Sequence, residues 1–183
     1  MARLPYLEKS DLAEADRDVL SREINLYKIL AHSRNAARAF QGLGRFIRFE
    51  SALDPRLREL AILMVGYLTR SPYEYSHHIK IGRDFGVSDD DIRGLIAEAE
   101  GQPSSLEPLA KTVLTAAIEM TRAGAVAPET FAALENDLDR EHLMDLIITI
   151  AFYNGVVRVL ASTGIDVEDS YMPYLEEFPL PSD

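Results

Sequence analysis

The spacing of the apolar residues constrains this chain more than any other feature of its sequence. Along most of the chain these residues recur every three or four positions, and capping residues separate one apolar group from the next. This spacing places side chains on one face of an α-helix, whereas a half-buried β-strand would alternate apolar and polar positions. The pattern therefore predicts an all-α protein.

Helix starts are marked by Ser or Asp, which accept hydrogen bonds from free backbone amides, and by Pro in the first turn. The clearest start is Asp54 followed by Pro55, ahead of an apolar helix that we expect to be buried. Residues 24–27 link the first two helices or continue one of them. We predict helices over residues 11–23, 33–49, 55–68, 72–86, 88–100, 106–122, 128–134 and 140–161.

The length of 183 residues and the 47% hydrophobic content suit one domain with a sizeable core. We expect a single helical domain over residues 1–183, with an N-terminal helical extension over about residues 1–50. Residues 166–183 are acidic and interrupted by prolines, which favours an extended arm. The apolar side chains of this arm predict that it docks on a protein surface, and a neighbouring subunit is one candidate.

Composition excludes several classes of function. No apolar run reaches the roughly 18 to 20 residues that span a bilayer, and the N-terminus lacks the apolar core of a secretory signal. We therefore expect a cytoplasmic location and no membrane partner. A net charge of -11 repels phosphate backbones, so no nucleic-acid partner is expected either. Because the chain has no cysteine, thiol-based catalysis and disulfides are excluded.

Titratable side chains concentrate in residues 53–63 and 71–78. Glu74 and His78 are four residues apart, so on a helix they share one face and can hydrogen-bond. A carboxylate beside an imidazole raises the pKa of the ring and orients it, as a general acid or base requires. Glu59, flanked by apolar residues on the preceding helix, is the third candidate, since a partly buried carboxylate needs a partner.

Each of these three residues also has a purely structural interpretation. Glu74 lies three residues after Ser71, which is the spacing of a capping box that closes the helix start. His78 could pack at an interface, and Glu59 could pair with an arginine. Sequence alone leaves these alternatives open.

Other side chains are candidates for binding a substrate. Tyr73 and His77 flank the same helix turn, where an aromatic ring can line a pocket or pack. Asn154 interrupts an apolar helix, so it orients a site residue or makes a helix–helix hydrogen bond. A metal site is a rival use of Glu74 and the two histidines. We expect none, because adjacent His77 and His78 point about 100° apart on a helix.

Three motifs resemble the carboxymuconolactone decarboxylase and alkylhydroperoxidase-D superfamily. They are LDPRLRELAIL at 53–63, YEYSHH at 73–78 and GVSDDDI at 86–92. Residues 141–158 also resemble the closing helix of longer members. The resemblance implies an all-helical fold that assembles into homo-oligomers, as a dimer, trimer or hexamer, with sites near the subunit contacts.

The resemblance also implies a choice between two chemistries. The peroxidase branch uses a Cys-x-x-Cys pair whose positions are taken here by Ser71 and Glu74, while its supporting glutamate and histidine match Glu59 and His78. Serine and glutamate cannot reduce a peroxide through a thiolate, so thiol peroxidase activity is excluded.

The decarboxylase branch needs neither a thiol nor a cofactor. In that branch a lactone loses carbon dioxide and a proton is delivered to the resulting dienolate carbon. The resemblance then makes His78 the proton donor and Glu74 the group that tunes and orients it, while Glu59 completes a relay or holds water. Arg58 or Arg70 would hold a substrate carboxylate, or would form a surface ion pair.

We interpret the chain as a cofactor-independent, carboxymuconolactone decarboxylase-like acid–base enzyme, a lyase or isomerase, acting on a small carboxylated or lactone-type compound. The alternative is a non-catalytic ligand-binding or assembly protein that retains the same fold.

Overall fold

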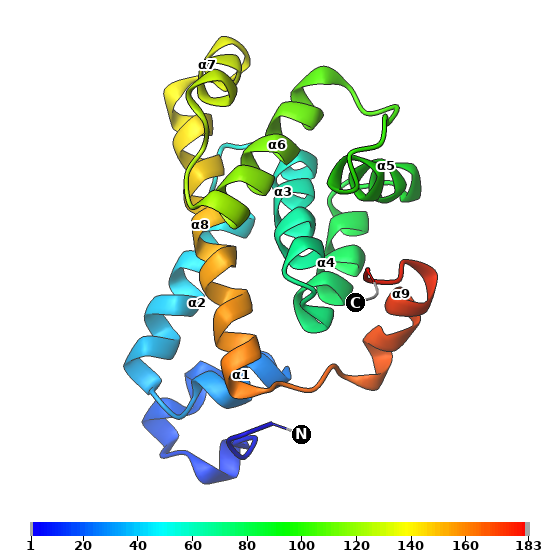
Figure 1. Ribbon diagram of the computed structural model, residues 1–183. Coiled ribbons are helices and arrows are strands. Elements are labelled where there is room, and N and C mark those ends of the chain that lie inside the picture. The colour runs from blue at the N-terminus through cyan, green and yellow to red at the C-terminus, as the bar shows by residue number, and fades with distance from the viewer. Residues whose placement is uncertain (1, 182–183) are drawn as a thin grey trace.

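The described part of the chain, residues 2–181, is helical throughout and contains no strand in this computed structural model (Figure 1). The α-helices are α1 (Asn25–Leu30), α2 (Arg34–Phe49), α3 (Pro55–Leu68), α4 (Pro72–Asp84), α5 (Asp89–Ala99), α6 (Pro108–Ala123), α7 (Pro128–Asp137), α8 (Arg140–Thr163) and α9 (Met172–Glu177). Short 3-10 helices occupy Lys9–Asp11, Glu14–Leu20 and Asp169–Tyr171. The prediction of an all-α protein is confirmed for these residues.

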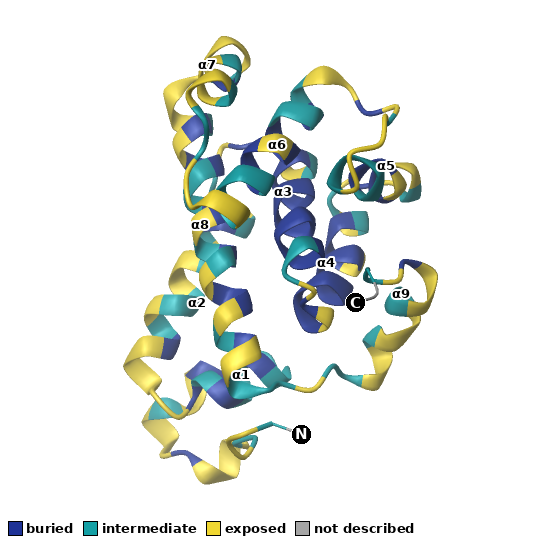
Figure 2. Cartoon of the chain, in the orientation of Figure 1, coloured by how far each residue is buried: buried dark blue, intermediate teal, exposed yellow. Residues whose placement is uncertain are grey.

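Helix α3 forms the centre of the core and packs against α4, α5, α6 and α8. Every residue from Leu57 to Tyr67 is buried, which Figure 2 shows as a dark blue helix. The start is the predicted one, since Asp54 Oδ1 accepts from the amide of Leu57 at 3.0 Å and Pro55 occupies the first turn. The burial of this helix carries Glu59 into the core.

Helices α3 and α4 approach each other closely next to the turn that joins them. A Cβ added at Gly66 would lie 3.2 Å from the backbone of Tyr75, which is closer than an ordinary van der Waals contact, so glycine favours this approach. The turn between the helices contains Arg70, whose φ is +49°. The two helices also meet at Gly82 of α4, where an added Cβ would lie 3.6 Å from Cβ of Glu59, so Glu59 lies directly against α4.

Helix α8 is the one helix in residues 2–181 whose length and composition would allow it to cross a membrane. Half of its most apolar window is buried inside the protein, and the helix packs against α3, α6 and α7. Its apolar side chains, including Tyr153 and Val156, therefore contribute to the core and to the walls of the cavity described below.

The N-terminal segment differs from the prediction. The α-helix expected over residues 11–23 is replaced by the two 3-10 helices Lys9–Asp11 and Glu14–Leu20. The guanidinium of Arg38 on α2 donates to the carbonyl of Ala15 at 3.2 Å and to the carboxylates of Asp16 and Asp18. Because Arg38 lies far away in the sequence, the spacing of apolar residues within the segment could not predict these hydrogen bonds or the 3-10 helices that they accompany.

The C-terminal arm also differs from the prediction. Residues 166–181 are not extended throughout, because they contain a 3-10 turn and α9. The arm docks on α4 of its own chain: Glu177 accepts from Arg83 at 2.7 Å, and Phe178 is buried. Residues 182–183 of the predicted arm lie outside the described residues.

Candidate active site

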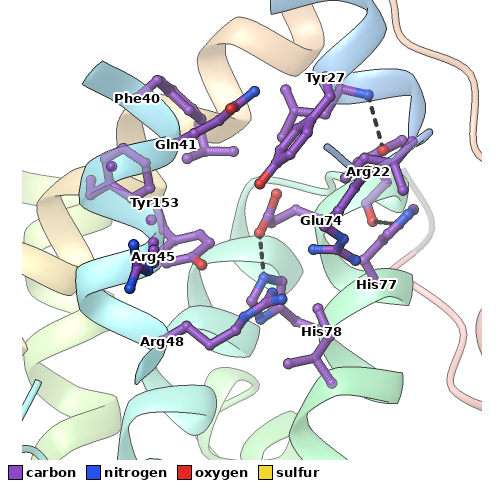
Figure 3. Close-up of a pocket in the computed structure, with 18 of the residues that line it drawn as sticks. Arg22, Tyr27, Phe40, Gln41, Arg45, Arg48, Glu74, His77, His78 and Tyr153 are labelled. Carbon is purple, nitrogen blue, oxygen red and sulfur yellow. Dashed lines mark hydrogen bonds and ion pairs between the residues drawn. The ribbon is translucent and has the colours of Figure 1, made fainter. Parts of the chain in front are cut away.

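A cavity of about 460 Å³ lies between α2 and α4 and is bounded further by the α1 region and α8. Figure 3 shows Glu74 and His78 of α4 facing the side chains of α2 across this space. Its walls combine apolar and aromatic side chains with a few polar ones. The lining includes Arg22, Ile24, Leu26, Tyr27, Phe40, Gln41, Arg45, Arg48, Phe49, Tyr73, Glu74, His77, His78, Ile81, Phe152, Tyr153 and Val156. A volume of this size accommodates a small organic molecule.

Glu59, His78 and Glu74 form a continuous chain of polar contacts at the base of the cavity. Nδ1 of His78 lies 2.6 Å from Oε2 of Glu59, and Nε2 of His78 lies 2.9 Å from Oε1 of Glu74. All three side chains are at least 95% buried. The one-turn spacing on α4 joins Glu74 to His78, and the close approach of α3 brings in Glu59.

The two carboxylates keep the His78 ring protonated at neutral pH. Burial by itself lowers the pKa of His78, but the charges and hydrogen bonds of Glu59 and Glu74 outweigh it and raise that pKa to about 9. Burial likewise raises the pKa of Glu59, and the neighbouring His78 and Arg58 reverse that effect and lower it. The cluster therefore holds an imidazolium between two carboxylates.

Arg58 supplies the second positive charge of this buried cluster. Its guanidinium donates two hydrogen bonds to Oε1 of Glu59, at 3.1 and 3.2 Å, and lies 4.6 Å from the centre of the Phe85 ring. Two cations, Arg58 and His78, thus balance the two carboxylates. A buried arrangement of this kind is tolerable only when its charges and hydrogen bonds are matched.

The capping-box interpretation of Glu74 is wrong. Ser71 is the N-cap of α4, but its side chain makes no capping hydrogen bond, and Pro72 provides the first turn. Glu74 bonds His78 instead. The side chain is thereby directed into the cavity and away from the end of the helix.

Tyr73 and His77 belong to a second cluster, which the C-terminal arm completes. The His77 ring is stacked between the rings of Tyr73 and Tyr171, at centroid distances of 4.0 and 3.6 Å. Glu168 accepts from the Tyr73 hydroxyl at 3.1 Å and from the amide of Asn25 at 2.8 Å. Both Tyr73 and His77 also line the cavity, so this cluster forms part of its wall.

The electrostatics of Glu168 reflect these contacts. Burial raises its pKa, but His77 and the amide of Asn25 reverse that effect and lower the pKa to about 2. Nε2 of His77 lies 3.2 Å from Oε2 of Glu168, although the two atoms are not aligned for a hydrogen bond. The carboxylate is therefore ionised and ties the arm to α1 and α4.

Three other predicted site residues do not line the cavity. Arg58 is buried against Glu59, and Arg70 is exposed in the turn between α3 and α4. Asn154 donates to Thr121 Oγ1 of α6 at 3.0 Å and to the Ile150 carbonyl at 3.1 Å, which is the helix–helix hydrogen bond considered above as an alternative.

The sequence prediction missed the arginines that do line the cavity, Arg22, Arg45 and Arg48. Arg45 and Arg48 are three residues apart on α2, so they project from one face of that helix. This spacing is visible in the sequence, but nothing in it indicates that this face meets α4. Among residues 2–181, no group of three His, Asp or Glu side chains is arranged to hold a metal ion.

The family model of the carboxymuconolactone decarboxylase family matches residues 34–106, a segment that contains Glu59, Glu74 and His78. This match agrees with the resemblance that the three motifs indicate for residues 53–92. No curated protein matches it.

Solved structures of similar fold cover nearly the whole chain. A peroxidase-related protein with an alkylhydroperoxidase AhpD core from Ralstonia eutropha JMP134 has a TM-score of 0.75 and 20% identity, covering 95% of both chains. A peroxidase-related protein from Silicibacter sp. TM1040 has a TM-score of 0.69 and 19% identity, covering 93% of both. The debrominase Bmp8, in a cysteine-to-alanine variant with 2,3,4-tribromopyrrole, has a TM-score of 0.78 and 19% identity, covering 93% of this chain and 94% of its own. At these identities the similarity establishes the fold.

Proposed function

We propose that the protein is a cofactor-independent acid–base enzyme that acts on a small carboxylated or lactone-type compound. The observation that carries this proposal is the chain of contacts from Glu59 through His78 to Glu74, which ends at a cavity of about 460 Å³. The bound ring of the Bmp8 structure supports it, because a relative of the same fold accommodates a small aromatic molecule.

The geometry suggests a division of roles within the cluster. Both ring nitrogens of His78 already contact carboxylates, so the ring has no free nitrogen for a substrate. No contact other than the one to His78 is described for the Glu74 carboxylate within residues 2–181, and Glu74 lines the cavity. Glu74 is therefore the group that exchanges the proton with the substrate, while His78 resupplies it and Glu59 holds the ring in place.

Decarboxylation illustrates the proposed chemistry. The bond to the departing carboxylate breaks, carbon dioxide leaves, and the electron pair remains on the substrate as a dienolate. The Nε2 proton of His78 first moves to the Glu74 carboxylate, and Glu74 then delivers that proton to the dienolate carbon, which leaves His78 neutral. One proton enters the product, and a proton from solvent then returns the His78–Glu74 pair to its starting protonation state. A proton-transfer group in such a position contributes about 10²- to 10⁴-fold to a rate.

The test is a turnover screen of lactones and dicarboxylates, followed by carbon dioxide release and ultraviolet absorbance. We expect turnover of at least one compound, lowered at least about 100-fold in Glu74→Gln and in His78→Gln. The matched control is His142→Ala, which removes a partly exposed histidine that pairs with Asp139 on the surface. Full turnover in Glu74→Gln would contradict the proposed role of Glu74.

A second candidate function is ligand binding without turnover. The doubly occupied His78 ring favours it, because a closed cluster of matched charges also serves as a rigid wall. Ligands from the same screen would then raise the melting temperature, since they bind the folded state, and none would be converted. We further propose that the protein is cytoplasmic and forms homo-oligomers.

A further inference from the structure

The charge that lines the cavity is opposite in sign to that of the whole chain. The chain carries a net charge of -11, yet the ionised side chains lining the cavity are three arginines, the protonated His78 and a single carboxylate, Glu74. A cavity lined by one sign of charge attracts ligands of the other sign, even on a protein that repels them elsewhere.

Two of these arginines have no carboxylate partner. Arg45 lies 3.4 Å from Glu50, whereas Arg22 and Arg48 have no ion pair among residues 2–181. Their guanidinium groups lie 6.0 Å from the Tyr27 ring and 5.8 Å from the Phe49 ring, respectively. Both side chains are half-buried. Exposed arginines without an ion pair are neutralised by solvent, whereas Arg22 and Arg48 lie half-buried at the cavity, where an anionic ligand can pair with them.

The positions of these arginines suit one end of a ligand. Figure 3 shows Arg48 and Arg45 on α2 and Arg22 across the cavity, with Glu74 and His78 between them. Arg48 is close enough to the buried cluster to lower the pKa of Glu59. Phe40, Phe152 and Tyr153 supply an adjoining apolar and aromatic wall. The cavity thus offers an apolar surface with a fixed cation at one side.

We propose that Arg48 is the anion-binding residue of this cavity, and that the ligand is a carboxylate carried on a ring-sized apolar body, drawn in by the added field of Arg22. A planar guanidinium matches a carboxylate with two parallel hydrogen bonds. The inference deepens the proposed function, on whose cavity it rests, by selecting a carboxylate over a neutral lactone.

The test measures binding, so it does not depend on turnover. Benzoate and its uncharged analogue benzamide are titrated calorimetrically into the native protein at low salt. We expect benzoate to bind at millimolar concentration or below and benzamide to bind at least about 10-fold more weakly. Added salt should weaken the binding of benzoate, because the interaction is between charges that are partly exposed.

Three variants locate the site. Arg48→Gln should raise the Kd for benzoate about 10- to 100-fold, since it removes a charged hydrogen bond, and Arg48→Lys should restore part of the loss. The matched control is Arg93→Gln, which removes an exposed arginine that pairs with Asp90 on α5. Its Kd should equal that of the native protein. The thermal unfolding of each variant without ligand is measured in parallel to check that the variant is folded. If Arg48→Gln does not fold, the comparison is made with Arg48→Lys.

Three results would overturn the inference. They are equal binding of benzoate and benzamide, no binding of benzoate to the native protein at millimolar concentration, and a change of less than about threefold in Arg48→Gln. Arginine-dependent binding of benzoate without turnover of any compound would uphold the inference and contradict only the proposed catalysis.

Discussion

At the scale of single residues, the site depends on a histidine that two carboxylates hold in its charged form. Moving a charged side chain from water into a protein interior costs free energy. The side chain stays charged there only when opposite charges and hydrogen bonds offset that cost. Glu59 and Glu74 meet that requirement for His78, and Arg58 meets it for Glu59. The charge state of the ring is therefore a property of the fold, and it can be measured.

The first prediction concerns that charge state. In the folded protein the pKa of His78 is raised from 6.5 to about 9, so the folded state binds this proton more tightly than the unfolded state. An NMR titration of the imidazole nitrogens should place the midpoint of His78 near pH 9. A midpoint at or below pH 6.5 would contradict the double pairing.

The same shift predicts how stability depends on pH. The contribution of protonated His78 is complete below about pH 6.5 and is lost as the pH rises through about 9. Urea denaturation should show the native protein losing, between these values, on the order of 3 kcal/mol of unfolding free energy more than His78→Gln loses. Equal pH slopes in the two proteins would show that His78 is not charged in the fold.

Some contacts of this site can be predicted from the sequence, and others cannot. The four-residue spacing of Glu74 and His78 predicts their contact because a helix fixes which side chains are neighbours. The spacing of Ser71 and Glu74 equally fits a capping box, and the structure shows that Glu74 contacts His78 instead. The role of Arg48 depends on the packing of α2 beside α4, which no local pattern encodes.

At the scale of the helices, α3 and α4 approach closely at Gly66, in the same helix pair that holds Glu59 and His78. We predict that Gly66→Ala lowers the free energy of unfolding by about 1 kcal/mol, because a Cβ 3.2 Å from the Tyr75 backbone forces the helices apart. The cost of overpacking exceeds the gain of up to about 1 kcal/mol in helix propensity. Chemical denaturation measures the change.

A matched control separates packing from helix propensity. Gly155 lies within α8 and has no atom within 4 Å of an added Cβ, so Gly155→Ala should stabilise the protein by up to about 1 kcal/mol. The two glycine-to-alanine changes are thus expected to differ in sign. Stabilisation by both would mean that the α3–α4 contact can relax without cost.

The C-terminal arm gives the next prediction. Glu168→Ala removes the acceptor for the Tyr73 hydroxyl and the Asn25 amide, and we expect a loss of about 1 to 3 kcal/mol in unfolding free energy. Glu176→Ala, at an exposed position on α9, is the control and should change stability by less than about 0.5 kcal/mol. Limited proteolysis should cleave the arm faster in Glu168→Ala alone. Equal cleavage in both variants would show that Glu168 does not tie down the arm.

The elements themselves were largely predictable, since most helix starts carry their own signal. Asp54 with Pro55, Ser88 with Asp91 and Asp139 all cap helices as their sequence indicates. The failures share a cause, because the segment near Arg38 and the arm at Glu168 are shaped by residues far away in the chain. Local sequence patterns predict helices whose ends are capped by neighbouring residues. They do not predict segments whose conformation depends on hydrogen bonds to distant residues.

At the scale of the whole molecule, large apolar side chains remain exposed on α2 and α8. Phe49 is 68% exposed and Met144 is 54% exposed, and Phe49 also lines the cavity. A net charge of -11 makes copies of the chain repel one another, so any association must come from short-range burial of such side chains. Added salt should therefore have opposite effects on the two processes: it should weaken the binding of an anionic ligand and should not weaken association between copies of the chain.

The last prediction follows from this contrast. Light scattering at micromolar concentration should give a multiple of 20.5 kDa, and added salt should preserve or strengthen the assembly because it screens the repulsion. Phe49→Asp should shift the mass toward that of one chain, whereas Phe131→Asp, on α7, is the control and should leave it unchanged. A mass of 20.5 kDa for the native protein would contradict the homo-oligomer. Dissociation by salt would instead mean that ion pairs, and not the apolar face of α2, hold the copies together.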